Sequence, residues 1–288
     1  MDNKQPQNIS MSGKRVVITG PTSGFGKEIA VQLAKLGAGL VLACRDIARG
    51  EQTADEISRL TGAKQCTVMY FDASSQQSIH EFALEFRKRW SRLDVLVNNA
   101  GINTPRRQMS VDGIELTFAT NVLGYFLLSN DLLGVLRASA PARIVNVAST
   151  YAGDLDLTDL QFERRAYEGR KAYKQSKACN RMLTWAFARR LEGSGVTANA
   201  MAPGLVVATR LYRNTPPAVM LLMRVLGLFF GRSIAQGADT AIWLSSSPEV
   251  EGKNGGFFEQ RKEVPCSFRN SEAEEKLWSI CEGLTRHP

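Results

Sequence analysis

Tyr173 and Lys177 are the side chains of this sequence whose types and spacing most clearly suggest acid-base chemistry. They lie four residues apart in the segment Tyr-Lys-Gln-Ser-Lys, and on a helix that spacing makes them neighbours on one face. A free phenol has a pKa of about 10, too high for ready proton exchange near neutrality. A positive charge within roughly 4 to 6 Å stabilises the phenolate and lowers that pKa. The pair therefore predicts a tyrosine that can act as a general acid or base.

Ser149 is a second candidate, because it directly follows an apolar run over residues 143–148. The run is typical of a buried strand bounded by Pro141 and Gly153. In open α/β sheets, ligands bind at the carboxyl ends of strands, which is where this hydroxyl would lie. Taken alone, both features have plain structural readings, since Tyr-Lys pairs are common on solvated helices and a serine often caps a loop.

A glycine-rich turn over residues 19–26 follows the apolar strand 16–18 and opens a helical pattern. Strand, glycine turn and helix are the order that a dinucleotide requires, because glycine lets the backbone approach the pyrophosphate and the helix start offers free N–H groups. The spacing is wider than G-x-G-x-x-G, and a lone turn of this kind can be only a tight connection. The residues expected at the cofactor are Gly20, Thr22, Ser23, Gly24, Phe25 and Gly26.

Apolar strand patterns alternate along the chain with amphipathic helical patterns. Such alternation predicts an α/β fold, a single doubly wound Rossmann domain with a seven-stranded parallel sheet flanked by helices. No linker or repeat divides the 288 residues, so residues 13–288 are expected to form one domain after a disordered leader over 1–12. A last helix is expected over 271–284. The expected strands lie near 15–19, 39–43, 66–71, 94–97, 143–147, 196–200 and 255–258.

The net charge of +8 comes from dispersed basic residues, which favours a solvated surface over a nucleic-acid interface. Five scattered cysteines without a C-x-x-C pair indicate reduced thiols, and two isolated histidines make a zinc site improbable. No metal is expected. The first 12 residues lack the features of a signal or transit peptide, so a cytoplasmic protein is predicted.

Taken together, these motifs resemble the short-chain dehydrogenase/reductase superfamily, whose pattern is TGxxxGxG, NNAG, N, S and YxxxK. The similarity covers nearly the whole chain, and within the superfamily the sequence is similar to the retinol dehydrogenase group, through 43–46, 143–147, 172–177, 189–191 and 195–197. The matching residues are Gly20, Gly24, Gly26, Asn98, Asn99, Ala100, Gly101, Asn121, Ser149, Tyr173 and Lys177.

The resemblance implies a role for each catalytic candidate. Ser149 and Tyr173 would hydrogen-bond a substrate carbonyl oxygen, and Tyr173 would supply the proton. Lys177 would hold the nicotinamide ribose and lower the phenol's pKa, and Asn121 would anchor a water that relays protons. Other cofactor contacts implied by the family are Asp72, Ala73, Asn99, Ala100, Gly101, Tyr173, Lys177, Pro203 and Gly204, with Thr209 one residue later than the family places it.

Cofactor choice depends on the end of the second strand, where NAD-binding folds commonly place a carboxylate and an arginine accommodates the 2′-phosphate of NADP. Here Cys44 takes that place and Arg45 follows. NADP(H) is therefore expected in preference to NAD(H). The alternative is that Arg45 only pairs with Asp46 on the surface.

The apolar segment 218–230 is too short, and too interrupted by Arg224, to span a bilayer. It fits a core helix, an apolar substrate lid near 205–232, or a peripheral membrane contact or subunit interface. The resemblance favours the lid and hence a lipophilic or aromatic carbonyl, which would be interconverted with its alcohol. Two other classes remain open, a catalytically weak nucleotide-binding protein and a membrane or partner-interaction protein. The oligomeric state is not predicted.

Overall fold

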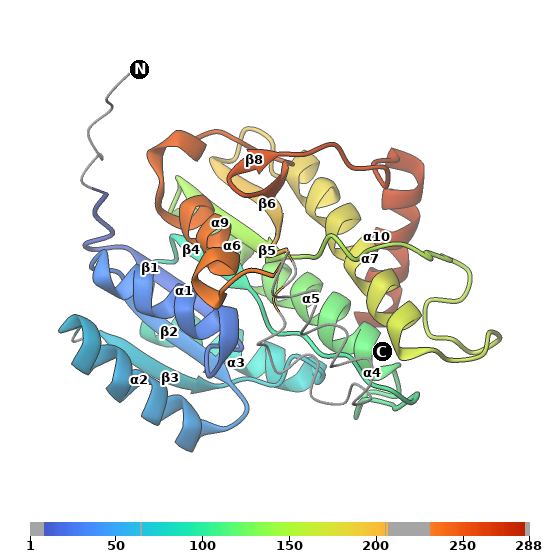
Figure 1. Cartoon of the computed structure of the whole chain (residues 1–288), viewed down its shortest axis with the longest axis horizontal. Helices are drawn as coiled ribbons and strands as arrows, with labels where there is room; N and C mark the ends of the chain where they lie inside the picture. The colour runs from blue at the N-terminus through green and yellow to red at the C-terminus, as the bar shows by residue number, and fades with distance from the viewer. Residues whose placement is uncertain (1–8, 64, 205, 207–230, 286–288) are drawn as a thin grey trace.

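The computed structural model describes residues 9–63, 65–204, 206 and 231–285, which form one twisted sheet covered by helices on both faces (Figure 1). The strand order is β3-β2-β1-β4-β5-β6-β7-β8. The strands are β1 (Arg15–Thr19), β2 (Gly39–Cys44), β3 (Cys66–Tyr70), β4 (Val95–Asn98), β5 (Ala142–Val147), β6 (Val196–Ala202), β7 (Phe257–Glu259) and β8 (Lys262–Glu263).

The helices belong to two layers. Helices α1, α2 and α9 contribute to the core on one face of the sheet, and α3, α5, α7 and α10 contribute to the core on the other. The helical segments are α1 (Gly24–Lys35), α2 (Ile47–Thr61), α3 (Gln76–Arg89), α4 (Leu116–Phe118), the π-turn η1 (Ala119–Leu123), α5 (Gly124–Asp131), α6 (Leu133–Ala138), α7 (Gly169–Arg190), α9 (Ile234–Ser246), the 3₁₀ turn η3 (Pro248–Val250) and α10 (Ser271–Thr285).

Burial on both faces explains why the strands are continuous apolar runs. In β1, Val17 belongs to one core, whereas Val16 and Ile18 belong to the other. Successive side chains of a strand point to opposite faces, so a strand buried on both sides needs apolar residues at every position. The doubly wound Rossmann prediction is therefore confirmed, with β1 at the predicted residues and parallel pairing from β3 through to β7.

The sheet has an eighth strand that was not predicted. β8 pairs antiparallel with β7, through Phe258 with Glu263 and Glu259 with Lys262. It is two exposed charged residues long, so it carries no apolar pattern that would mark a strand.

The ordered domain begins earlier than predicted. Met11 is buried in the core beside α1, and its N–H donates to the Leu36 carbonyl at 2.7 Å. The disordered leader predicted over 1–12 therefore extends too far into the ordered domain. Residues 1–8 lie outside the described residues. Thr209, the apolar segment 218–230 and most of the predicted lid also lie outside them.

Candidate active site

A cleft of about 570 Å³ opens at the carboxyl ends of the parallel strands. Its walls include residues that directly follow β1 to β6, as expected for an open α/β sheet, and residues of the helices beside them, α7 among them. The predicted residues that line the cleft are Gly20, Thr22, Ser23, Gly24, Phe25, Arg45, Asp72, Ala73, Asn99, Ala100, Gly101, Ser149, Tyr173, Lys177, Pro203 and Gly204.

A larger hollow of about 1090 Å³ lies at the opposite edge, where strands begin near Asp94, Ala142 and Val196. Neither Ser149, Tyr173 nor Lys177 lines this hollow. Volume alone would favour the larger hollow as the active site, but the side chains capable of proton transfer gather in the smaller cleft.

Two glycines shape the turn after β1, each for a different structural reason. Gly20 has a φ of +64°, which an L side chain rarely adopts. Gly26 lies in α1, outside the cleft lining, and a Cβ there would come within 2.3 Å of the Gly20 carbonyl oxygen and 2.5 Å of Nδ2 of Asn99. Gly26 therefore permits close packing of α1 on the turn, while the N-cap Ser23 accepts no hydrogen bond from the helix start.

Thr19 joins this turn to the segment after β4. Its Oγ1 accepts hydrogen bonds from the backbone N–H groups of Asn99 and Ala100, both at 2.9 Å. In return, Nδ2 of Asn99 donates to the carbonyls of Thr19 at 2.8 Å and Gly20 at 3.1 Å. Thr19 is not among the predicted site residues, because its place at the start of the glycine turn gives no sign of a contact with the segment after β4.

Tyr173 and Lys177 lie on α7, with the Lys177 Nζ 5.7 Å from the centre of the Tyr173 ring. Nζ also donates to the Val147 carbonyl at 2.8 Å and lies 5.5 Å from the centre of the Tyr125 ring. Lys177 is only 3% exposed, and this burial lowers the pKa of its ammonium to about 7. The pair predicted from the spacing thus meets in an apolar setting at the edge of the cleft.

Ser149 lies just beyond β5 and lines the same cleft as these two side chains. Its Oγ accepts a hydrogen bond from the Tyr151 N–H at 3.0 Å. A hydroxyl that accepts in this way still has its own proton to donate. Ser149 can therefore donate a hydrogen bond to an oxygen placed in the cleft.

Asn121 lies in the π-turn η1 between α4 and α5 and is fully buried. Its side chain exchanges hydrogen bonds with the backbone of Ile102, at 2.8 and 3.0 Å, and donates to Oγ of Ser176 at 3.0 Å. Both amide protons are used inside the protein, so the side chain holds α7 against the segment after β4. A π-turn inside a helix is often found at functional sites because it displaces backbone groups from regular pairing.

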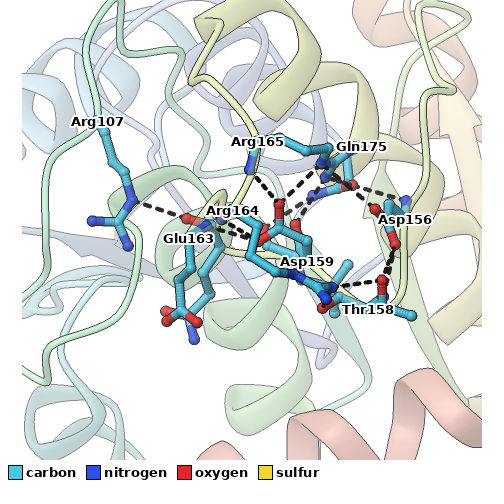
Figure 2. Close-up of polar contacts among 10 residues, drawn as sticks. Arg107, Asp156, Thr158, Asp159, Glu163, Arg164, Arg165 and Gln175 are labelled. Atoms are coloured by element: carbon cyan, nitrogen blue, oxygen red, sulfur yellow. Dashed lines mark hydrogen bonds and ion pairs between the residues drawn. The ribbon is translucent and has the colours of Figure 1, made fainter.

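The connection between β5 and α7 is organised around one carboxylate (Figure 2). Asp159 accepts hydrogen bonds from the N–H groups of Glu163, Arg164 and Arg165, and its Oδ2 pairs with the Arg165 guanidinium at 3.1 Å. Burial opposes its charge, but the hydrogen bonds from Arg165 and Glu163 prevail and lower its pKa to about 2.

Gln175 fastens this connection to α7 from a position between Tyr173 and Lys177. Its Oε1 accepts from the Asp156 N–H and from Arg165, both at 3.0 Å, and its Nε2 donates to the Leu160 carbonyl at 3.0 Å (Figure 2). The helix that carries the Tyr-Lys pair therefore also fixes the loop that leads into it.

The far end of the cleft is basic. Arg45 and Arg49 both line it, and among the residues that the structure describes neither makes an ion pair. Asp46 instead caps α2 by accepting from the Arg49 N–H at 3.0 Å. Burial raises the pKa of the Cys44 thiol to about 11, so the position where a carboxylate could stand is held by a neutral group.

Several lining residues were not predicted from the sequence. Arg49 could have been found by its position in the first turn of the helix that follows Arg45. The others carry no motif, because Phe71 simply follows β3 and the rest reach the cleft through the path of the loop after β4 and the approach of α4 and η1. The unpredicted lining residues of this kind are Phe71, Ile102, Asn103, Thr104, Pro105, Gln108, Leu116 and Thr120.

Within the described ranges, none of the helices is both long enough and apolar enough to cross a bilayer. The same ranges contain no cluster of three or more His, Cys, Asp or Glu side chains that could hold a metal. The five cysteines are all free.

A parallel sheet, a glycine turn after its first strand and a Ser, Tyr and Lys set at one edge together define a dinucleotide-dependent oxidoreductase. The model of the short chain dehydrogenase family matches residues 14–219, and the chain belongs to that family. Its curated relatives make it retinol dehydrogenase-like, and it is therefore an oxidoreductase that acts on alcohol or carbonyl groups.

Two relatives illustrate the similarity. Human retinol dehydrogenase 14 is 40% identical over a 292-residue alignment, which covers 94% of this chain and 86% of the relative. Mouse retinol dehydrogenase 12 is 40% identical over 282 residues, which cover 96% of this chain and 88% of the relative.

Solved structures agree on the fold. An uncharacterised protein from Mycobacterium paratuberculosis matches with a TM-score of 0.76 and 31% identity, covering 96% of this chain and 95% of that one. The RhlG protein of Pseudomonas aeruginosa, solved as a complex with NADP, matches with a TM-score of 0.69 and 28% identity, covering 88% of this chain and 96% of that one.

Proposed function

We propose that this protein is an NADP(H)-dependent reductase that converts a lipophilic or aromatic carbonyl compound to its alcohol, and the alcohol back, in the cytoplasm. The observation that carries the proposal is the buried Lys177 ammonium beside the Tyr173 ring, in the same cleft as the glycine turn. The NADP pool of a cytoplasm is held mostly reduced, which favours carbonyl reduction as the working direction.

The residues of the cleft fit a dinucleotide. Gly20 and Gly24 have positive φ angles of 64° and 56° and leave the turn without side chains that would block a pyrophosphate. Lys177 uses one of its three N–H donors on Val147, which leaves two for the hydroxyls of a ribose. A bound nicotinamide would supply or accept the hydride.

Ser149, Tyr173 and Lys177 would manage charge around the substrate oxygen. Ser149 donates a hydrogen bond to the carbonyl oxygen and stabilises the negative charge that develops on it. Tyr173 supplies the proton to that oxygen, and the positive charge of Lys177 favours the resulting phenolate. Asn121 joins α7 to the segment after β4, and we retain the proposal that Asn121 anchors the water that renews the proton.

The preference for NADP rests on the basic end of the cleft. Arg45 and Arg49 can offer guanidinium groups to a phosphate on the adenosine ribose, whereas Cys44 offers a neutral thiol where a carboxylate would accept a ribose hydroxyl. Asp72 and Ala73 lie on the neighbouring wall, where we place the adenine.

The preference for a lipophilic substrate rests on the relatives, which are named for retinol. We also keep the proposal that the apolar segment 218–230 covers the substrate, although it lies outside the described residues. Peripheral membrane contact by that segment would suit a substrate dissolved in lipid.

The test is the oxidation of NADPH and NADH with a panel of lipophilic aldehydes, ketones, retinoids and quinones. We expect activity with NADPH on part of the panel. Tyr173→Phe should lower the rate at least about a hundredfold while leaving NADPH affinity near normal. Tyr70→Phe, which removes an exposed hydroxyl, is the matched control. An unchanged rate in Tyr173→Phe would refute the assignment, and lipid binding without turnover of any compound would favour an interaction protein.

A further inference from the structure

Arg181 is a buried cation on the helix that carries Tyr173 and Lys177. It is 6% exposed, and in the part of the chain that the structure describes it forms no ion pair with a carboxylate. Burying a charge is costly unless other groups compensate for the lost water. The groups around Arg181 therefore show what the guanidinium is used for.

The main hydrogen-bond acceptor of Arg181 is the backbone of the proposed catalytic serine. Its Nη2 donates to the Ser149 carbonyl, and its Nη1 donates to Sγ of Cys266 at 3.4 Å. The guanidinium carbon lies 3.8 Å from the centre of the Phe257 ring and 5.6 Å from that of Phe268. Aromatic faces partly replace the water that the cation has lost.

Lys177 and Arg181 use the same geometry on successive turns of α7. Lys177 donates to the Val147 carbonyl, and Arg181, four residues later, donates to the Ser149 carbonyl, two residues later. The two cations therefore tie successive turns of α7 to the last residue of β5 and to the backbone just beyond it.

We propose that Arg181 is a positioning residue that fixes Ser149 for hydride transfer chemistry, an inference that rests on the proposed function of that serine. Arg181 holds the Ser149 carbonyl, and the Tyr151 N–H holds Oγ of Ser149. With its backbone and its acceptor lone pair both engaged, the serine keeps its hydroxyl proton for an oxygen in the cleft.

The geometry also indicates why the residue is an arginine. One guanidinium can reach the Ser149 carbonyl and the Cys266 sulfur with two different nitrogens while its plane stacks on Phe257. A lysine at this position has a single nitrogen and no plane to stack. Arg181→Lys should therefore keep the charge and lose the positioning.

The experiment measures kcat, KM and dinucleotide affinity for Arg181→Met, Arg181→Lys and the control Arg269→Met. Arg269 is exposed and stacks on Trp185 of α7 at 5.7 Å, so it tests the loss of an arginine from a neighbouring aromatic contact. We expect kcat for carbonyl reduction to fall about tenfold to a hundredfold in both Arg181 variants. Dinucleotide affinity should stay within about twofold, and Arg269→Met should match the wild type.

A double variant separates positioning from a general structural effect. If Arg181 acts through Ser149, Arg181→Met should lower kcat little further once Ser149→Ala has removed the hydroxyl. The inference would be overturned if the two substitutions lowered kcat independently, so that their fold-losses multiplied in the double variant. It would also be overturned if Arg181→Met lowered kcat and dinucleotide affinity by equal factors. If Arg181→Met does not fold, Arg181→Lys carries the same cycle. A wild type without reductase activity would refute the proposed function and this inference together, whereas an active wild type and an unaffected Arg181→Met would refute this inference alone.

Discussion

The Nζ atom of Lys177 lies 5.7 Å from the centre of the Tyr173 ring, and both residues are buried in α7 at the edge of the cleft. Burial lowers the pKa of Lys177 to about 7, so near neutral pH both the ammonium and the amine form are populated. Groups that stabilise its charge, such as the oxygens of a bound dinucleotide, would therefore favour the form that assists Tyr173.

The low pKa of Lys177 predicts a pH-dependent stability. In the unfolded chain a lysine titrates near 10.4, so between pH 7 and that value the unfolded state holds a proton that the folded state lacks. The free-energy cost of burying Lys177 is therefore greatest below pH 7 and decreases as the pH rises toward about 10.4. We expect Lys177→Met to stabilise the protein more at pH 6 than at pH 10. Urea unfolding of both proteins at each pH measures this, and a pH-independent difference would contradict it.

Gly26→Ala should weaken dinucleotide binding by about tenfold or more, because the added Cβ would lie 2.3 Å from the Gly20 carbonyl oxygen and force the turn apart. The matched control is Gly134→Ala in α6, where a Cβ meets no atom within 4 Å. Gly134→Ala should bind NADPH with normal affinity, and its free energy of unfolding should rise by up to about 1 kcal/mol because alanine has the higher helix propensity. Fluorescence titration with NADPH and thermal melting distinguish the two variants, and normal binding by Gly26→Ala would argue against this packing.

Arg45→Ala should raise the Kd for NADPH about tenfold while changing the Kd for NADH less than twofold, because only NADPH carries the phosphate that a guanidinium binds. Arg59→Ala, at the exposed end of α2, removes an equal charge away from the cleft. Titration of all three proteins with both cofactors provides the comparison. Equal weakening for NADPH and NADH would remove Arg45 from cofactor selection.

Asp159→Asn should destabilise the protein at pH 7 and progressively less toward pH 2. The carboxylate has a pKa of about 2 in the folded chain and about 3.9 in an unfolded one, so its stabilising contribution is present above pH 4 and is lost as the pH falls through 2. The control is Asp55→Asn, whose side chain is exposed on α2. Chemical unfolding from pH 7 to pH 2 follows the effect, which a constant difference across that range would disprove.

Local pattern predicted the scaffold well. The run before Gly20 predicted β1 near residues 15–19, where the structure has it, because burial on both faces leaves consecutive apolar residues over 16–18. Spacing also predicted that Tyr173 and Lys177 would meet, since helix geometry alone brings residues four apart together.

Contacts between distant residues could not be predicted in this way. Gln175 reaches Leu160 and Arg165 only because the intervening chain folds back along α7. Arg181 would be read as a surface charge, and only the approach of Phe257 and Cys266 shows that it is buried. In both cases the deciding neighbour lies beyond the range over which helix or strand periodicity applies.

The short strand β8 has a consequence for assembly. Because it occupies the outer hydrogen-bonding groups of Phe258 and Glu259, another molecule cannot continue the sheet from β7 without first displacing it. In the described ranges the opposite margin of the sheet is β3, five residues long and without a further neighbour. Two molecules that shared one continuous sheet would therefore join through β3 or through the two-residue β8, and not directly through β7.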